Sequence, residues 1–211
     1  MKRYLPVVII AAVALLTVAA GARVYRARLH PLSSAVAAPA SVGKIDEKTA
    51  HILGGPNAPV TLEEFGDFQC PSCSLVSSII HSLEHDYGPR LRVVFRQFPL
   101  KMHPHALEAA IAAEAAGLQG RFWEMHDLLY EHQSAWSEVQ NVQPLFGAYA
   151  ANLGLDVDRF NKDIQTPAVN ARVAADMERG VSRGVRNTPS LVVHGRELPG
   201  TGPFTRERVH A

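Results

Sequence analysis

The chain has 211 residues and a mass of 23.0 kDa, which is enough for one domain of ordinary size plus appendages and too little for two catalytic domains. Its 21 basic and 20 acidic residues leave a formal charge of +1, so the composition indicates neither a general nucleic-acid binder nor an acidic tail protein. The two cysteines, Cys70 and Cys73, lie too close in sequence to form the disulfide framework of a small secreted domain. Chemistry, metal binding or chance remain as reasons for the pair.

The N-terminus carries an apolar segment that is expected to meet a membrane. Lys2 and Arg3 precede an uncharged run from Leu5 to Ala22, whose 18 residues just reach across a bilayer core at ~1.5 Å rise per residue. We interpret residues 1–22 as an uncleaved signal anchor. A cleavable signal peptide is the alternative, because Ala20-Gly21-Ala22 provides a small-x-small end.

Residues 23–50 follow this segment and are interpreted as a linker. They mix Arg, Pro, Ser and Ala without a hydrophobic period, and a polar patch runs from Lys44 to Lys48. Folded structure is therefore expected to begin near His51, after a tether that lifts the domain off the membrane.

A β-α-β unit is predicted around the cysteines. Val60–Phe65 is β-prone and follows a breaker cluster of glycine and proline. Apolar residues then recur at helical spacing from Leu75 to Leu83, until Gly88-Pro89 ends the helix. Leu91–Phe98 is again a strand pattern, and a strand reached through a helical crossover is expected to run parallel to the first.

The remainder of the chain is predicted to be mostly helical. Helices are expected at Pro104–Gly117, Phe122–His132, Pro144–Leu153, Asp158–Gln165 and Pro167–Arg179. A two-stranded hairpin, Ser190–His194 with Arg196–Leu198, follows them, and a last partial helix begins at Pro203. This order predicts an α/β fold in which a sheet and its helices receive an all-helical insertion.

The Cys70-Pro71-Ser72-Cys73 motif falls between the first strand and its helix. At the start of a helix, unpaired amides and the helix dipole stabilise a thiolate on the first sulfur, while the second sulfur is close enough to form a disulfide. Pro71 fits the first turn, where its missing N–H costs no hydrogen bond. We therefore predict that Cys70 is an exposed nucleophile and Cys73 a buried resolving thiol. A metal site is the alternative, although zinc usually takes four ligands and no second cluster is clearly paired with this one.

Several separate motifs, in a fixed order, carry a family resemblance. They are Gly54–Pro59, Glu64–Cys73, Phe98–Leu100 with His103-Pro104, Gly120–Trp123 and Gly184–Ser190. Together they resemble the DsbA-like thiol-disulfide oxidoreductases of the thioredoxin superfamily over about His51 to Gly202. The resemblance implies a thioredoxin fold, with its N-terminal part at residues 51–102, a helical insertion at 103–183 and its C-terminal part at 184–211.

The same resemblance assigns roles to individual residues. It implies that Cys70 is the nucleophile, that Cys73 is the resolving cysteine, and that Pro189 forms a cis peptide bond facing the disulfide, with the Thr188 backbone available to substrate. On the sequence alone, Pro189 fits an ordinary strand-start residue equally well. Pro71 and Ser72 support the motif, although strongly oxidising members typically have Pro-His between the cysteines. The final helix is also shorter than in relatives, since the chain ends at Ala211.

Glu64 matches the buried acidic residue of the family. Independently, Glu63 and Glu64 adjoin within a predicted central strand, so alternation turns one of them inward. A buried carboxyl group has a raised pKa and could pass protons to Cys73. The alternative is that Glu64 lies near a solvated strand end.

Four histidines and three aromatic residues have competing interpretations. His103 and His105 follow the second strand, so either could approach the thiol or lie on a solvated loop. His81 and His85 are four residues apart on a helix, which fits either a metal pair or a solvated face. The aromatic side chains are expected to fill the core of the helical insertion: Phe122, Trp123 and Trp136.

We therefore expect an extracytoplasmic protein, periplasmic or on the cell-envelope side, that is anchored by its own N-terminal helix, or secreted if the signal is cleaved. Its expected partners are exported polypeptide substrates and a membrane redox protein, with no nucleic acid and no cofactor. The alternatives are an extracytoplasmic reductase or isomerase and, from a different class, a metal-binding module that uses Cys70 and Cys73.

Overall fold

The computed structural model describes residues 50–198, which form a mixed five-stranded sheet surrounded by helices. The strands are β1 (His51–Leu53), β2 (Val60–Gly66), β3 (Leu91–Gln97), β4 (Ser190–Val193) and β5 (Arg196–Glu197). Their order in the sheet is β1-β3-β2-β4-β5. β2 is central and runs parallel to β3, as predicted, whereas β1 and β4 run antiparallel to their neighbours.

The helices follow the predicted order closely. They are α2 (Pro71–Tyr87), the 3-10 turn η1 (Gly88–Arg90), α3 (Ala106–Gly117), α4 (Phe122–Glu131), α5 (Gln133–Trp136), α6 (Gln143–Asn152), α7 (Val157–Asp163) and α8 (Pro167–Ser182). β1 and α5 were not predicted, because elements of three and four residues are too short to show a hydrophobic period.

One predicted helix start differs from the structure. α3 begins at Ala106 and not at Pro104, since the preceding segment is bound elsewhere. The backbone N–H of His105 donates to Gln69 Oε1 at 2.6 Å, beside the cysteine motif. The predicted anchor at residues 1–22, the linker up to residue 49 and the partial helix from Pro203 lie outside the described residues.

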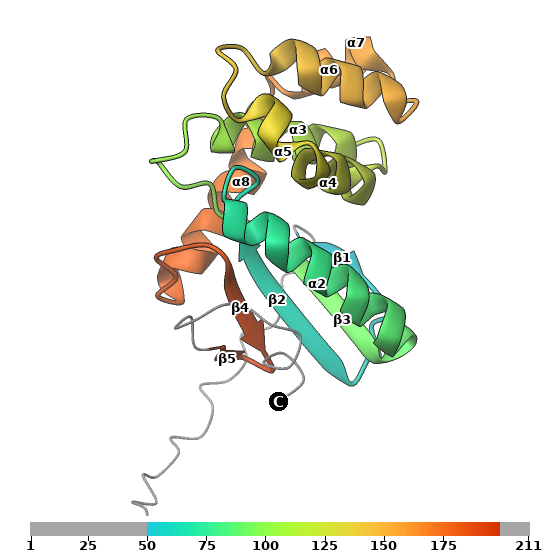
Figure 1. Ribbon diagram of the computed structural model, residues 1–211, viewed down its shortest axis with the longest axis vertical. Coiled ribbons are helices and arrows are strands. Elements are labelled where there is room, and N and C mark those ends of the chain that lie inside the picture. Colours follow the sequence, from blue (N-terminus) through green and yellow to red (C-terminus); the bar gives the residue numbers. More distant parts are fainter. Residues whose placement is uncertain (1–49, 199–211) are drawn as a thin grey trace, which may run out of the picture. The chain divides into compact units, whose positions relative to one another are not determined.

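The two faces of the sheet are covered by different helices. α2 crosses one face (Figure 1) and contributes Val76, Ile80 and Leu83 to a core shared with Leu62 of β2. α8 packs on the other face, where a side-chain carbon at Gly180 would collide with the ring of Phe98, so only glycine allows this approach. No helix within residues 50–198 has the length and apolar composition needed to cross a membrane.

The helices α3 to α7 form a separate layer beyond one end of the sheet (Figure 1). Its core includes the predicted aromatic residues Phe122 and Trp136, while Trp123 is only partly buried. The same apolar cluster contains Cys70 and Cys73. The cysteine motif therefore lies where the helical layer meets the sheet.

Candidate active site

Cys70 precedes the first residue of α2, and its backbone initiates that helix. The N–H groups of Cys73 and Ser74 donate to the Cys70 carbonyl oxygen at 3.1 and 3.3 Å. Pro71 occupies the first helical position, as predicted. Cys73 is fully buried, as predicted. Cys70 is only 7% exposed, so it is more buried than the prediction of an exposed nucleophile implies. The Thr188 carbonyl oxygen and the Gln133 side chain both contact Cys70 and contribute to its burial.

The two thiols have opposite pKa shifts. The pKa of Cys70 is lowered to about 5, chiefly because the Cys73 thiol hydrogen-bonds to its sulfur, with smaller contributions from Thr188 and the backbone N–H groups of Cys73 and Ser72. The pKa of Cys73 is raised well above its usual range, first by burial and then by the same hydrogen bond. At neutral pH, one sulfur is therefore a thiolate and the other a thiol.

The loop before β4 brings a distant segment to the sulfur. The Thr188–Pro189 peptide bond is cis, which confirms that expectation. The Cys70 sulfur lies 3.5 Å from the Thr188 carbonyl oxygen, and it can donate to that oxygen when the thiol is protonated. The Thr188–Pro189 loop therefore faces the cysteine pair.

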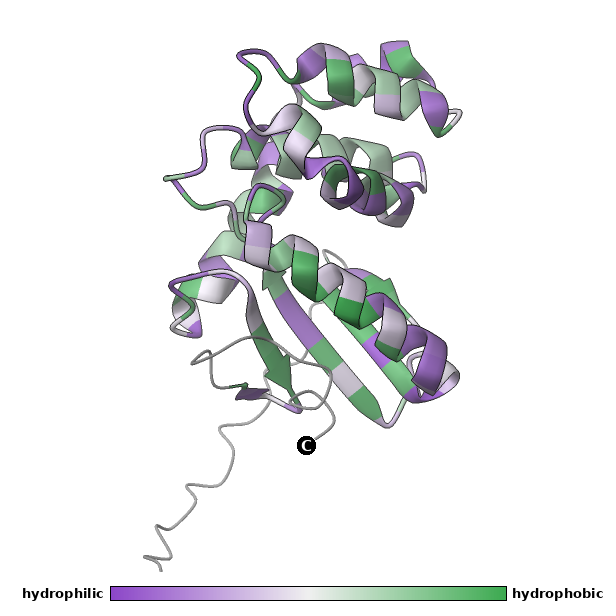
Figure 2. Ribbon diagram, viewed as in Figure 1, coloured by the Kyte–Doolittle hydropathy of each residue, from purple (hydrophilic) through white to green (hydrophobic). Residues whose placement is uncertain are grey.

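Glu63 and Glu64 are both buried, on opposite faces of β2. Glu64 is 1% exposed, its Oε1 atom makes no hydrogen bond within residues 50–198, and it faces α2. Burial raises its pKa to about 8, and the negative charge of Cys70 adds to the shift. The interpretation of Glu64 as a residue at a solvated strand end is therefore wrong. Hydrophilic bands interrupt the otherwise hydrophobic β2 and β3 (Figure 2).

Asp67, between β2 and Cys70, holds the loops of the site together. Asp67 accepts a hydrogen bond from the backbone N–H of Gln69 at 2.7 Å and another from that of Leu100 at 2.8 Å. Its Oδ2 atom also lies 2.7 Å from His103 Nδ1. The imidazole of His103 is thus bound to a carboxylate, and Asp67, which sequence reasoning did not single out, ties the cysteine loop to the loop after β3.

Gln133 in α5 is a second residue that sequence reasoning missed. Its side-chain amide donates to the carbonyl oxygens of Phe68 at 2.6 Å and Cys70 at 3.0 Å. No sequence signal marks this residue, because it acts only through the packing of a four-residue helix against the motif.

The other three histidines singled out in the sequence also lie near carboxylates, and for His85 this is Asp86, at 3.4 Å from Nδ1. His105 Nδ1 lies 2.6 Å from Glu108, and His81 contacts Asp127 at 3.1 Å and Glu84 at 3.4 Å. These carboxylates raise the pKa of His81 to about 10, and burial opposes them. Within residues 50–198, no group of three or more His, Cys, Asp or Glu side chains is arranged to hold a metal ion.

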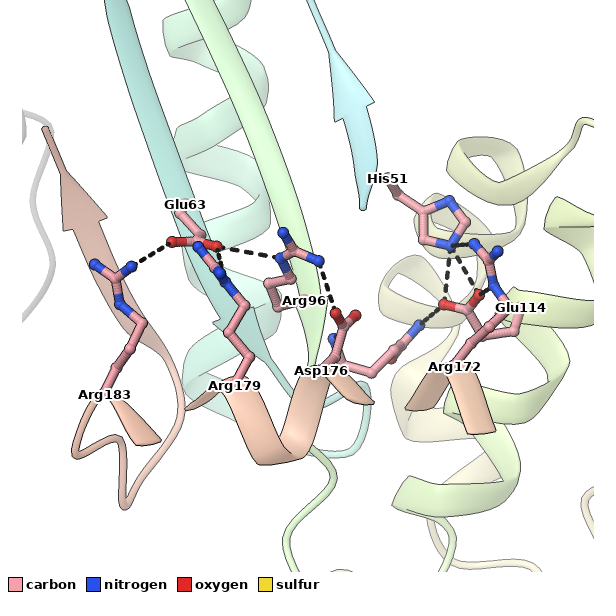
Figure 3. Close-up of polar contacts among 9 residues, drawn as sticks. His51, Glu63, Arg96, Glu114, Arg172, Asp176, Arg179 and Arg183 are labelled. Carbon is pink, nitrogen blue, oxygen red and sulfur yellow. Dashed lines mark hydrogen bonds and ion pairs between the residues drawn. The ribbon is translucent and has the colours of Figure 1, made fainter. Parts of the chain in front are cut away.

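A buried ion cluster lies on the opposite face of the sheet (Figure 3). Glu63 accepts from Arg96 at 3.1 Å and Arg179 at 2.9 Å, and lies 3.6 Å from Arg183. Arg96 also donates to Asp176 at 2.8 Å. Because Arg179, Arg183 and Asp176 lie on or next to α8, the cluster fixes the helix that leads into the Thr188–Pro189 loop.

A second group of charges extends this cluster toward β1. Glu114 of α3 lies 2.9 Å from His51 and accepts from Arg172 at 2.6 Å (Figure 3). These interactions lower the pKa of Glu114 against the raising effect of burial. Together, the two groups join the sheet, α3 and α8.

The order of strands and helices, with a Cys-x-x-Cys pair at the start of α2 and a cis-proline before β4, defines a thioredoxin-like fold. Residues 46–209 match the family model described as Thioredoxin, and the chain belongs to this family.

Solved structures with the same fold include DsbA-like proteins. A thioredoxin-like oxidoreductase from Silicibacter pomeroyi DSS-3 gives a TM-score of 0.63 at 29% identity, over 77% of this chain and 88% of that one. BdbD from Bacillus subtilis gives 0.68 at 22% identity, over 77% and 90% of the two chains. The thiol-disulfide exchange protein α-DsbA2 from Wolbachia pipientis gives 0.66 at 21% identity, over 78% and 85%. The last two similarities concern the fold.

Curated relatives are much longer than this chain. The chain is 40% identical over 161 residues to a protein named Na(+)/H(+) antiporter NhaA 1 from Mycolicibacterium gilvum (strain PYR-GCK). The matched region covers 74% of this chain and 25% of that protein. The chain thus spans about a quarter of the length of the curated relatives it matches. Their name describes the relatives, and the transport activity in it is not assigned to this chain.

Proposed function

We propose that the protein is a thiol-disulfide oxidoreductase that exchanges disulfides with exported polypeptides through Cys70 and Cys73. The contrast between the two sulfurs carries the proposal: the pKa of Cys70 is lowered to about 5, while burial keeps Cys73 protonated. In such a pair, the Cys70 thiolate can attack a substrate disulfide, or a substrate thiolate can attack Cys70 in the protein disulfide. Cys73 can then resolve the mixed disulfide between Cys70 and the substrate. Pro71 and Ser72 set the spacing between them.

An oxidising direction is favoured by the same observation. A thiolate stabilised on Cys70 lowers the free energy of the reduced protein, and the disulfide therefore becomes a stronger oxidant. Ser72 stands where strongly oxidising relatives have histidine, yet the Cys73 thiol and the helix amides still stabilise the thiolate. A reductase or isomerase is the alternative, and it would require a lower reduction potential.

Thr188 and Pro189 are proposed to bind the substrate backbone. The Thr188 carbonyl oxygen is already within 3.5 Å of the Cys70 sulfur, and β4 begins at Ser190. An extended polypeptide could therefore pair with the Thr188 backbone as an added strand, which would place its cysteine at Cys70.

Glu64 is proposed to exchange a proton with Cys73. Its carboxyl group is buried, and its pKa of about 8 leaves it mostly protonated at neutral pH. The protonated carboxyl group can give its proton to a departing Cys73 thiolate, and the carboxylate that remains can accept the Cys73 proton when Cys73 attacks.

The proposed location is extracytoplasmic, with residues 1–22 as the anchor and a membrane redox protein that restores the disulfide. A reporter active only in an oxidising compartment, fused after Ala211, should be active and should sediment with membranes. Release into the soluble fraction would indicate a cleaved signal. Activity of a reporter that works only in the cytosol would contradict the location.

Disulfide transfer tests the function directly. The oxidised full chain is mixed with a reduced, unfolded polypeptide that contains two cysteines, and mass spectrometry follows the products. We expect the polypeptide to gain a disulfide, Cys70→Ser to be inactive, and Cys73→Ser to accumulate a mixed disulfide through Cys70. Stoichiometric zinc binding by the reduced protein without any disulfide transfer would instead favour the metal-binding module.

A further inference from the structure

Tyr130 in α4 carries a buried hydroxyl group that the site described above does not use. The residue is 4% exposed, and its Oη atom makes no hydrogen bond in the part of the chain that the structure describes. A buried hydroxyl group without a partner is unfavourable, and phenylalanine would fill the same space without that cost. The position of this hydroxyl group therefore suggests a function.

Tyr130 belongs to the apolar cluster that also contains Cys70 and Cys73. A side-chain carbon built on Gly66 would come within 3.1 Å of Tyr130 Oη, so the hydroxyl group approaches the end of β2, two residues beyond Glu64. The hydroxyl group of Ser74 donates to the Tyr130 carbonyl oxygen at 3.4 Å. The ring packs on that of Phe68, with 4.9 Å between centroids. Tyr130 is thereby held between the end of β2 and the first turn of α2.

The neighbouring groups can take up negative charge or protons. Burial raises the pKa of Tyr130 well above its usual range, and charges on nearby groups add to this effect, in the order Cys73, Glu64, Asp67 and Cys70. The phenol therefore keeps its proton at neutral pH and is available as a donor. His126, whose ring centroid is 4.9 Å from that of Tyr130, is kept neutral because burial lowers its pKa.

We propose that Tyr130 is a positioning residue for Cys73, the resolving cysteine. The Tyr130 hydroxyl group donates a hydrogen bond to the negative charge that forms on Cys73, and it aligns Glu64 for the transfer of the Cys73 proton. The proposal rests on the disulfide-exchange function proposed above. Glu64 Oε1 and Tyr130 Oη, two buried polar atoms that have no hydrogen-bond partner within residues 50–198, would then be satisfied when Cys73 becomes ionised.

Electrons pass from the substrate thiols to the protein disulfide in two successive thiol-disulfide exchanges. A substrate thiolate attacks Cys70 Sγ, the bond between the two protein sulfurs breaks, and its electron pair remains on Cys73, which then takes the proton of the Glu64 carboxyl group. The second substrate thiolate attacks the mixed disulfide and releases the Cys70 thiolate, so the substrate loses two electrons and the protein gains them. In reverse, the Cys70 thiolate attacks a substrate disulfide and releases one substrate thiolate. Cys73 then gives its proton to the Glu64 carboxylate and attacks Cys70 Sγ, which breaks the mixed disulfide, releases the second substrate thiolate and leaves the Cys70–Cys73 disulfide.

Tyr130→Phe tests the proposal because it removes only the hydroxyl group. The reduced protein is mixed with glutathione disulfide, and the decay of the Cys70–glutathione mixed disulfide is followed between pH 5 and 9. We expect decay about tenfold slower than in the wild type at pH 7, with a pH profile displaced upward by about one unit, as one lost hydrogen bond to a charge predicts. The rate at which Cys70 is alkylated should change less than about twofold.

Tyr149→Phe is the matched control, since it removes a hydroxyl group in α6 from a ring that stacks on His132. It should leave both profiles unchanged. A Tyr130→Phe profile equal to that of the wild type would overturn the proposal, and so would an equal change in Cys70 alkylation, which would indicate a structural role. A wild-type protein that forms no mixed disulfide at all would instead overturn the proposed function.

Discussion

At the scale of single residues, the site depends on two sulfurs in different surroundings. Cys70 lies at the start of a helix, where a neighbouring thiol and two amides stabilise its negative charge, and Cys73 is buried one turn further on. The position of the motif at the start of a helix was enough to predict different surroundings for the two sulfurs, and their roles as nucleophile and resolving cysteine stay a prediction. The residues that shape the loops around the pair, Asp67 and Gln133, could not be predicted because their partners come from other elements.

The low pKa of Cys70 predicts how the reduced protein is alkylated. Iodoacetamide reacts with the thiolate, so the rate should be half-maximal near pH 5 and nearly constant above about pH 7, and peptide mapping should find the label on Cys70. A free cysteine would still gain reactivity near pH 8.5. Preferential labelling of Cys73 would contradict the assignment.

Glu64 predicts a pH-dependent loss of stability. Its folded pKa of about 8 lies above the ordinary value of 4.5, so folding is penalised increasingly as the pH rises from 4.5 to 8. We therefore compare the unfolding free energies of reduced Glu64→Gln and reduced wild type. The difference between them should change in favour of Glu64→Gln by about 2–4 kcal/mol from pH 5 to pH 9. Urea unfolding at several pH values measures this difference. The exposed Glu138→Gln is the control, and parallel stability profiles for Glu64→Gln and the wild type would show that Glu64 is not held as a neutral acid.

At the scale of elements, the position of α8 depends on the ion cluster around Glu63. Its carboxylate lies within 3.6 Å of three arginines from β3 and the end of α8, and it is almost fully buried. Breaking a buried charge pair costs more than the intact pair contributes, because the remaining charge stays without water.

Glu63→Gln should therefore lower the free energy of unfolding by about 3 kcal/mol. Glu124→Gln removes a surface charge that pairs with Arg121 at 2.6 Å, and it should cost less than about 1 kcal/mol. Urea unfolding compares the two variants. Since Glu63 faces away from Cys70, the alkylation profile of Cys70 should persist in Glu63→Gln, and equal stability of both variants would contradict a structural role for the cluster.

The elements themselves could largely be predicted from the sequence. Strand β2, helix α2 and strand β3 have clear periodic patterns and glycine or proline at their ends, and each differs from its predicted bounds by a few residues at most. The pairing of Glu63 with Arg96 and Arg179 depends on how α8 packs on the sheet. Local patterns carry no information about that packing, which is why Glu63 was seen only as a neighbour of Glu64.

At the scale of the whole molecule, the sheet holds a chemically distinct site on each side of one strand. Glu64 faces α2 and the cysteines, while Glu63 faces α8, and both are buried. On the side toward α8, arginines neutralise the Glu63 carboxylate and hold α8 on the sheet. The side toward the cysteines leaves polar groups without partners in the described chain, as expected where protons and charge move during a reaction.

The reduction potential of the Cys70–Cys73 couple tests the central claim most directly. The full chain is equilibrated with mixtures of reduced and oxidised glutathione, and the oxidised fraction is determined after acid quenching. A thiolate stabilised on Cys70 predicts a single two-electron transition above about −200 mV, more oxidising than glutathione. A transition near or below about −270 mV, typical of reductases, or no disulfide at all, would contradict the proposal.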